Sequence, residues 1–305
     1  MSFKVRFWGV RGSIPCPGPT TVRYGGNTPC IELRIGPEER LIVIDAGSGI
    51  RELGNRLLAE AGGRGPLEAD IYLTHTHWDH IMGLPFFAPI YLPSTHLRVF
   101  GPVSHEGETL AAIVGGQMVY RYFPVRQEEL AARIEYANLK EGSFDLGGGL
   151  HLTTKYLNHP VLCLGYRFEY GGRIFCTAYD TEPFRNLFST DPADPSFDEL
   201  LAEEGDLVAR EQNGLIEEFF RGADLLVHDT QYTPEEYGKG RMGWGHTDTS
   251  DAARAAVRAG VRRLALFHHD PGRSDDQLDA LVAETAAANP GVDIFAAREG
   301  MEISL

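Results

Sequence analysis

Short runs of β-branched and aromatic residues recur along the whole chain and predict a protein rich in strands. Most of these runs are bounded by glycine, proline or polar clusters, as buried strands usually are. The predicted strands are FKVRFWGV, CIELRI, RLIVIDAG, ADIYLTH, LRVFG, HLTTKYL, LGYRFEY, RIFCTAYD, ADLLVHD, RLALFHH and VDIFAAREGMEISL.

Between these strands the pattern changes to apolar positions three and four residues apart, which predicts helices. The chain therefore mixes α and β structure throughout its length. The predicted helices are 50–61, 127–134, 215–220, 249–259 and 275–287, with a further helix beginning at His80.

Two regions, residues 85–145 and residues 182–206, depart from this pattern. The first carries prolines, glycines and the run QMVYRYFPV, and the second is acidic, with DPADPSFDELLAEEGD predicting a loop or short helix. Neither has the composition of an interdomain linker. We therefore interpret 1–305 as a single domain with insertions around 85–145 and 182–206.

Composition and charge narrow the class of protein. The 305 residues are 43% hydrophobic, which is ordinary for a globular protein, and the formal charge of −15 disfavours long nucleic acid as a partner. The four cysteines are scattered without a CxxC pair, and no apolar run reaches the length of a membrane span. These features predict a cytoplasmic protein without a membrane partner.

The stretch LTHTHWDHIMGL, which follows the apolar residues IYLT, contains a candidate metal site. If the strand continues to His77, then His75 and His77 project to the same face and can hold one ion. Asp79 and His80 follow where a helix is expected to begin, and can turn toward a second position. Imidazole and carboxylate are ligands for zinc, and manganese or iron tolerates the same set. The alternative is four polar side chains on an exposed loop.

This HxHxDH motif after a hydrophobic strand resembles the signature of the metallo-β-lactamase superfamily. The resemblance implies an αββα four-layer sandwich in which two mixed β-sheets are flanked by helices. It also implies that Asp45, in LIVIDAGSG, supports the ligand loop. The remaining ligands it implies are His159 in YLNHP, Asp180 in RIFCTAYDTEPF and His268 in LALFHHDP.

Together these residues imply two divalent metal ions, for which zinc is the expected metal. One ion would be held by His75, His77 and His159. The other would be held by Asp79, His80 and His268, and Asp180 would bridge the two ions. Outside this context His159 and Asp180 are equally compatible with structural roles, and His269 is the alternative to His268 because strand ends are placed only to within a few residues.

Two further segments resemble the branch of the superfamily that contains ribonuclease Z and the cyclic-phosphate dihydrolases. They are WGHTDTSDAARAAV, which contains His246, and ADLLVHDTQY, which contains Asp229. The resemblance implies that His246 contacts the scissile phosphate and that Asp229 orients it, an arrangement suited to proton donation. With Asp79 they form the predicted catalytic group. Alternatively, His246 starts a helix and Asp229 caps a strand end.

The N-terminal turns FWGVRGSIPCPGP and RYGGNTPCIEL also resemble this branch, and they place Arg11, Ser13 and Asn27 either at the site or in structural turns. A glycine-rich basic arm like that of ribonuclease Z is not apparent. The first insertion instead carries aromatic residues, which could stack a base or belong to the core. These departures argue against tRNA processing.

The leading hypothesis is a dinuclear metal-dependent phosphodiesterase that acts on a small or cyclic nucleotide-like phosphodiester. The rivals are a ribonuclease Z-like endonuclease, an esterase, thioesterase or lactonase on the same metals, and a non-catalytic scaffold that retains the fold. A homodimer is compatible with the sequence. We also expect the acidic segment 182–206 to lie near the mouth of the site, because it follows Asp180 in the chain.

Overall fold

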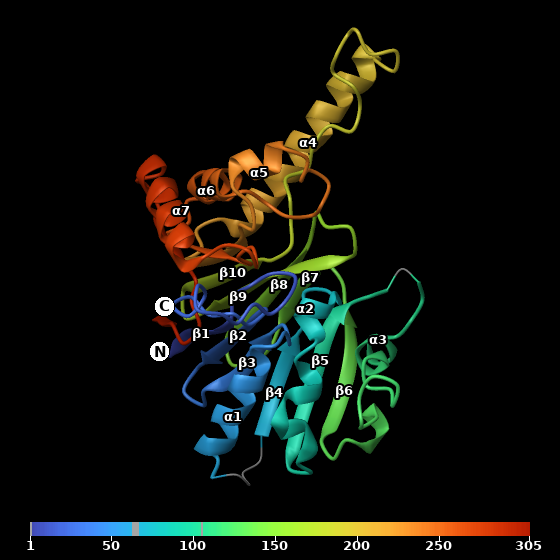
Figure 1. The fold of residues 1–305 in the computed structure, drawn as a ribbon, viewed down its shortest axis with the longest axis vertical. Coiled ribbons are helices and arrows are strands. Elements are labelled where there is room, and N and C mark those ends of the chain that lie inside the picture. The colour runs from blue at the N-terminus through green and yellow to red at the C-terminus, as the bar shows by residue number, and fades with distance from the viewer. Residues whose placement is uncertain (1, 63–66, 105) are drawn as a thin grey trace.

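The computed structural model describes residues 2–62, 67–104 and 106–305. Two mixed sheets lie face to face and helices cover both outer faces, as Figure 1 shows. This arrangement confirms the predicted αββα fold class. Each sheet contains seven strands among the described residues. These strands form from the alternating and continuous apolar runs of the sequence.

The first sheet has the order β14-β1-β2-β3-β4-β5-β6. Its strands are β1 (Phe3–Gly9), β2 (Cys30–Ile35), β3 (Arg40–Ile44), β4 (Leu67–Tyr72), β5 (Thr95–Pro102), β6 (Arg133–Leu139) and β14 (Glu302–Ser304). The second sheet has the order β13-β12-β11-β10-β9-β8-β7. Its strands are β7 (Gly142–Asp145), β8 (Leu150–Leu157), β9 (Cys163–Tyr170), β10 (Arg173–Ala178), β11 (Leu225–Asp229), β12 (Arg263–Phe267) and β13 (Asp293–Ala296).

The main hydrophobic core lies between the two sheets. Strand β1 shows why, because its side chains alternate between buried and half-buried, with Val5 and Phe7 fully buried. Phe7 packs against Phe267 from the opposite sheet, with ring centroids 6.2 Å apart. Burial of such alternating faces holds the sheets together and fixes the register of their strands.

Helices cover the outer faces of the sheets and close two smaller cores. Leu53 and Leu57 of the first helix are buried against the first sheet. The α-helices are α1 (Ile50–Glu60), α2 (Trp78–Ile81), α3 (Leu110–Gly116), α4 (Glu199–Phe220), α5 (Pro234–Gly238), α6 (Thr249–Arg258) and α7 (Asp275–Ala288), and the 3₁₀ helices are Leu84–Phe86, Ala88–Tyr91 and Gln127–Glu129.

The two sheets share one pairing pattern. In each sheet the strands pair antiparallel on one side and parallel on the other, with β3 to β6 parallel in the first sheet and β10 to β13 parallel in the second. Carboxyl ends of parallel strands are the usual place for ligand sites in such sheets. Asp45, Asp180, Asp229 and His268 all lie at or just after the carboxyl end of one of these strands.

The prediction of a helix over residues 127–134 is wrong. Only the 3₁₀ turn Gln127–Glu129 forms, and Arg133–Leu139 continues as β6, paired parallel with β5. Ile134 and Tyr136 alternate with exposed residues and pack against the core under α3. Pairing with a neighbouring strand outweighs the weak local helical pattern. The short strand β7 was also not predicted.

The predicted helix 215–220 is the last part of a much longer helix. α4 begins at Glu199, where the Asp198 carboxylate accepts the amides of Leu200 and Leu201. Its N-terminal half projects from the body of the molecule in Figure 1, so an apolar stripe facing a core is not required there. The region 182–206, predicted as a loop or short helix, is therefore a projecting arm that contains the first turns of α4.

No helix in the described part of the chain is long and apolar enough to cross a membrane.

Candidate functional site

The loop that follows β4 carries the central motif, but its geometry differs from the prediction. β4 ends at Tyr72, so His75 and His77 lie beyond the strand and are not aligned by strand alternation. α2 begins at Trp78, two residues earlier than predicted, which places Asp79 and His80 in its first turn. Leu73 still donates to the carbonyl of Phe100 in β5, and from Thr74 onward the chain leaves the sheet and binds Asp45.

Asp45 holds this loop in place, as the resemblance implied. Its carboxylate is fully buried and accepts the backbone amide of Thr74 at 2.7 Å and the Thr74 hydroxyl at 2.8 Å. It also accepts the Nδ1–H of His80 at 2.7 Å. This bond fixes the ring of His80 and leaves its Nε2 free to face the interior of the site.

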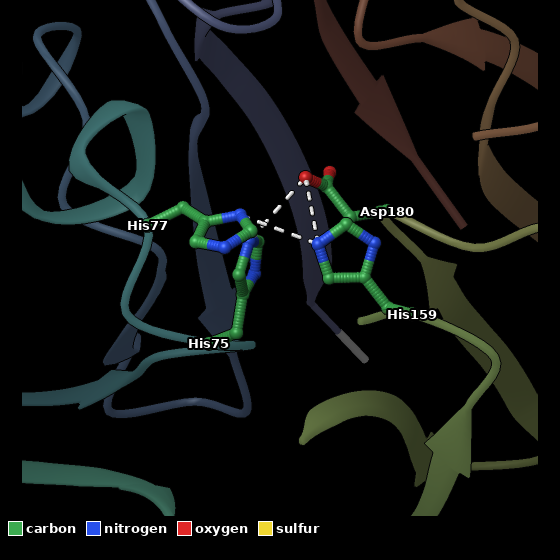
Figure 2. Close-up of side chains that lie close together, drawn as sticks. All are labelled: His75, His77, His159 and Asp180. Carbon is green, nitrogen blue, oxygen red and sulfur yellow. Dashed lines mark hydrogen bonds and ion pairs between the residues drawn. The ribbon is translucent and has the colours of Figure 1, made fainter. Parts of the chain in front are cut away.

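The first donor group brings together His75, His77, His159 and Asp180, whose nearest donor atoms all lie within 4.8 Å of one another. Figure 2 shows the four side chains converging from separate parts of the chain. His75 Nε2 lies 3.4 Å from Asp180 Oδ2, and His159 Nε2 lies 3.3 Å from His77 Nδ1. His159 is oriented by donating its Nδ1–H to the carbonyl of Gly245 at 3.0 Å.

The second donor group consists of Asp79, His80, Asp180 and His268, all of them buried. His268 Nε2 lies 3.2 Å from both Asp79 Oδ2 and Asp180 Oδ1, and His80 Nε2 lies 3.2 Å from Asp180 Oδ2. Asp180 thus belongs to both groups. The seven predicted ligands lie in these two groups, and Asp180 and His268 also lie within 4.8 Å of donor atoms of Asp229 and His246.

The chemistry of these groups fits divalent cations. The buried atoms His75 Nε2, His80 Nε2 and Asp180 Oδ1 have no hydrogen-bond partner among the described residues. Burial alone would lower the pKa of His80, but Asp180, Asp79 and Asp45 outweigh it and raise that pKa well above its ordinary value. The site therefore attracts positive charge, and its nitrogen and oxygen donors are those that divalent transition metals prefer.

Backbone strain is concentrated at the same place. Non-glycine residues with positive φ are uncommon. Five occur in the described part of the chain, and four of them are at the site: Ser13 (64°), Asp45 (59°), Asp180 (39°) and His268 (57°). Each such conformation costs about 1–3 kcal/mol. The fold sustains this cost where it places the donor atoms, which is typical of a functional site.

The two neighbouring histidines His268 and His269 point in different directions, and only His268 points into the site. The His269 ring is buried on the other side of the chain and donates its Nε2–H to the carbonyl of Ala297 at 2.9 Å. His268 enters the second donor group and donates its Nδ1–H to Gln231 Oε1 at 3.0 Å. The backbone of Gly12 passes against this ring, and a Cβ built there would lie 2.3 Å from it.

His246 and Asp229 form a pair beside the donor groups. His246 Nδ1 lies 2.8 Å from Asp229 Oδ2, and its ring stacks on His268 with centroids 4.9 Å apart. Burial opposes the charged form of His246, but the Asp229 carboxylate outweighs it and raises the pKa of the imidazole to about 9. His246 is not the cap of α6, since the Asp248 side chain accepts the amides of Ser250 and Asp251.

Other site residues were not predicted or were left open between two roles. The Ser13 amide donates to Asp79 Oδ2 at 2.7 Å, so this turn does reach the site. Arg11 is instead fully buried and donates to the carbonyls of Gly25 and Arg273, which makes it structural. Asn27 is also structural, bonded to Glu299. Gln231 and Gly245 orient ligands through contacts with residues distant in sequence, so no local signal identifies them.

The acidic segment meets the site only at its start. Both Glu182 carboxylate oxygens accept amides of the loop before His246, from Gly243 at 2.9 Å and Gly245 at 3.3 Å. The rest of the segment runs into α4 and away from the body (Figure 1).

Comparison with known proteins places the fold and this site in a family. Residues 23–268 match the model of the metallo-beta-lactamase superfamily, and the chain belongs to that superfamily. The family match and the donor groups assign it to the metal-dependent hydrolases.

Its relatives come from the branch that the resemblance indicated. The chain is 31% identical to a ribonuclease Z of Lactococcus lactis over 230 residues, covering 65% of this chain and 69% of that protein. Among solved structures, a diphosphatase from the PhnP family shares 16% identity with a TM-score of 0.61, covering 99% of this chain and 98% of that one. The short form of human tRNase Z shares 19% identity with a TM-score of 0.60, at the same coverage. The two structures support the fold alone.

Proposed function

We propose that this protein is a dinuclear metal-dependent phosphodiesterase that acts on a small or cyclic nucleotide-like phosphodiester. The observation that carries the proposal is the sharing of Asp180 by two converging donor groups, with the His246–Asp229 pair beside them. His75, His77, His159 and Asp180 would hold one ion. Asp79, His80, His268 and Asp180 would hold the other. Zinc is the expected metal, and manganese or iron would fit the same donors.

Divalent ions bound to such a donor set supply Lewis-acid charge and activate water for hydrolysis. Other groups of the chain orient the ligands. Ser13 presents its amide to Asp79 and so holds the Asp79 carboxylate in one orientation. Gln231 and Gly245 do the same for the rings of His268 and His159.

His246 is suited to complete the reaction as a proton donor. Its Nδ1–H is directed to Asp229 Oδ2, so Nε2 is the atom that would deliver a proton. When the bond between phosphorus and the leaving oxygen breaks, that oxygen would take the proton from Nε2. Asp229 is fixed in turn by the amides of Thr181 and Gln231, which keeps the imidazole in one orientation.

A second candidate, an RNA endonuclease, is favoured by the ribonuclease Z relatives. Against it stands the arm formed by residues 182–206, in which Arg185 is the single basic residue among many acidic ones. Such an arm would repel a phosphate backbone. The His246–Asp229 pair argues against a thioesterase, because a thiolate leaves as a stable anion and needs no proton donor.

A substrate panel separates these functions. We expect purified protein to hydrolyse bis-p-nitrophenyl phosphate and a small cyclic nucleotide, and to show little activity on a thioester or a precursor tRNA. Faster turnover of the precursor tRNA than of every small diester would contradict the proposal in favour of the endonuclease.

Metal content provides an independent prediction. Protein purified without chelator is expected to contain two transition-metal ions per chain, measured by inductively coupled plasma mass spectrometry. Removing them with a chelator should lower the melting temperature, because ions that bind only the folded state stabilise it. A single ion per chain, or a melting temperature unchanged by the chelator, would argue against two sites built from these residues.

A further prediction concerns Gly12, which leaves room for the His268 ring. A Gly12→Ala side chain would lie 2.3 Å from that ring and must displace it. Because misplacing a ligand usually weakens metal binding about 10- to 100-fold, we expect a loss of that order in chelator competition. Gly214→Ala, in α4 with no atom within 4 Å of the added methyl, is the matched control and should retain wild-type affinity. Equal affinities of the two variants would show that this close approach is unimportant.

A further inference from the structure

The protein has three tryptophans, and they fall into two kinds. Trp8 has a structural role. Its indole N–H donates to Glu32 at 2.9 Å, and the guanidinium groups of Arg6 and Arg56 lie over its ring. Trp78 and Trp244 are exposed, with 76% and 54% of their surface accessible. Neither of these two indole N–H groups has a hydrogen-bond partner among the described residues. Large exposed aromatics without a structural role are candidates for ligand contact.

Both exposed tryptophans are chain neighbours of the donor groups. Trp78 lies between His77 and Asp79, and His77 is itself exposed, so the site opens on this side. Trp244 precedes Gly245, whose carbonyl accepts the Nδ1–H of His159. Since His159 Nε2 lies 3.3 Å from His77 Nδ1, one pair of contacting imidazoles links the two tryptophan segments.

The segment that carries Trp244 is held in position. The amides on both sides of the tryptophan, from Gly243 and Gly245, donate to the Glu182 carboxylate, which also accepts the Tyr237 hydroxyl. The Arg241 guanidinium lies over the Trp244 ring, 4.5 Å from its centroid. This contact restrains the ring and places a positive charge beside it.

We propose that Trp78 and Trp244 form an aromatic rim at the mouth of the site, which stacks on a nucleobase while the phosphodiester reaches the donor groups. The substrate class is then a base-bearing phosphodiester of mononucleotide or dinucleotide size, and the inference rests on the proposed phosphodiesterase function. Stacking suits a nucleobase because every base has a flat π-face, whereas a base-free sugar phosphate offers no such surface. A long RNA is disfavoured by the acidic surface of the chain.

The first test compares a cyclic nucleotide with a base-free cyclic phosphodiester, such as glycerol cyclic phosphate. Stacking on one aromatic side chain is worth about 5- to 100-fold in binding. We therefore expect Trp78→Ala and Trp244→Ala each to raise KM for the cyclic nucleotide by roughly that factor, with kcat preserved and with KM for the base-free diester unchanged. Trp78→Phe and Trp244→Phe should restore part of the affinity.

Phe188→Ala is the matched control, because Phe188 is 47% exposed but belongs to the projecting arm. It should leave both KM values unchanged. The proposal is overturned if the double tryptophan variant binds the cyclic nucleotide as the wild type does, or if KM rises equally for both diesters. It is also overturned if only long RNA responds to the substitutions.

A second test needs no turnover and so remains informative if the proposed reaction is wrong. In a Trp8→Phe background the remaining tryptophans are Trp78 and Trp244, so their fluorescence reports directly on the rim. Adenosine 5′-monophosphate is expected to quench this fluorescence and to bind at least about fivefold more tightly than ribose 5-phosphate. Equal binding of the two compounds without quenching would refute base stacking, whereas base-dependent quenching in a protein without diesterase activity would refute only the reaction.

Discussion

His246→Ala is expected to lower kcat for an unactivated phosphodiester by about 10²–10⁴-fold, the usual contribution of a general acid. The reason is positional: Asp229 holds His246 Nδ1 at 2.8 Å, and the ring stacks against His268, while neither of the two donor groups includes His246. The substitution should therefore remove a proton donor while both donor groups stay intact. Metal analysis of the variant is the control, and it should match the wild type.

The leaving group provides the decisive comparison for this variant. A p-nitrophenolate departs as a stable anion, so the loss caused by His246→Ala should shrink for p-nitrophenyl diesters. Asp229→Asn should reproduce part of the defect, because the amide would misorient the imidazole. Equal losses for activated and unactivated diesters would show that His246 does not protonate the leaving oxygen, and would make a thioesterase a stronger candidate.

Asp180→Asn is expected to remove at least one ion per chain and to lower kcat by about 10³-fold or more, equivalent to several kcal/mol of transition-state stabilisation. Although burial opposes its ionisation, His268, His80 and His75 hold the pKa of the Asp180 carboxyl well below its ordinary value. An anion at this position is shared by both donor groups. The isosteric amide preserves the shape and abolishes the charge.

Asp224→Asn is the matched control for this substitution. Asp224 is also a buried aspartate, but it precedes β11 at the opposite end from Asp229 and binds Arg173 and Arg262. Its amide variant should lose some thermal stability and retain both ions and full activity. An Asp180→Asn variant that kept two ions and near-normal activity would contradict the shared position assigned to Asp180.

Much of the fold was predictable because most strands have a clear local hydrophobic pattern. The strands RLIVI and RLALF are apolar at every buried position and are followed directly by Asp45 and His268, so the strands could be predicted from the pattern and the two residues from the resemblance. The errors in predicting the secondary structure occurred where the local hydrophobic pattern is weak. β6 is an edge strand with four of its seven residues exposed, and most residues in the outer half of α4 are exposed.

The sequence by itself determined the strands and the clustering of donors in HTHWDH, because spacing and hydrophobic period act over a few residues, and its resemblance to the superfamily implied Asp45, Asp180 and His268. Only the tertiary structure decided which donors meet. Gly12 accommodates the ring of His268, Ser13 binds Asp79, and Gly245 orients His159 across gaps of dozens to hundreds of residues. Such contacts exist only once two sheets have packed and fixed the ends of their strands, so no local pattern encodes them.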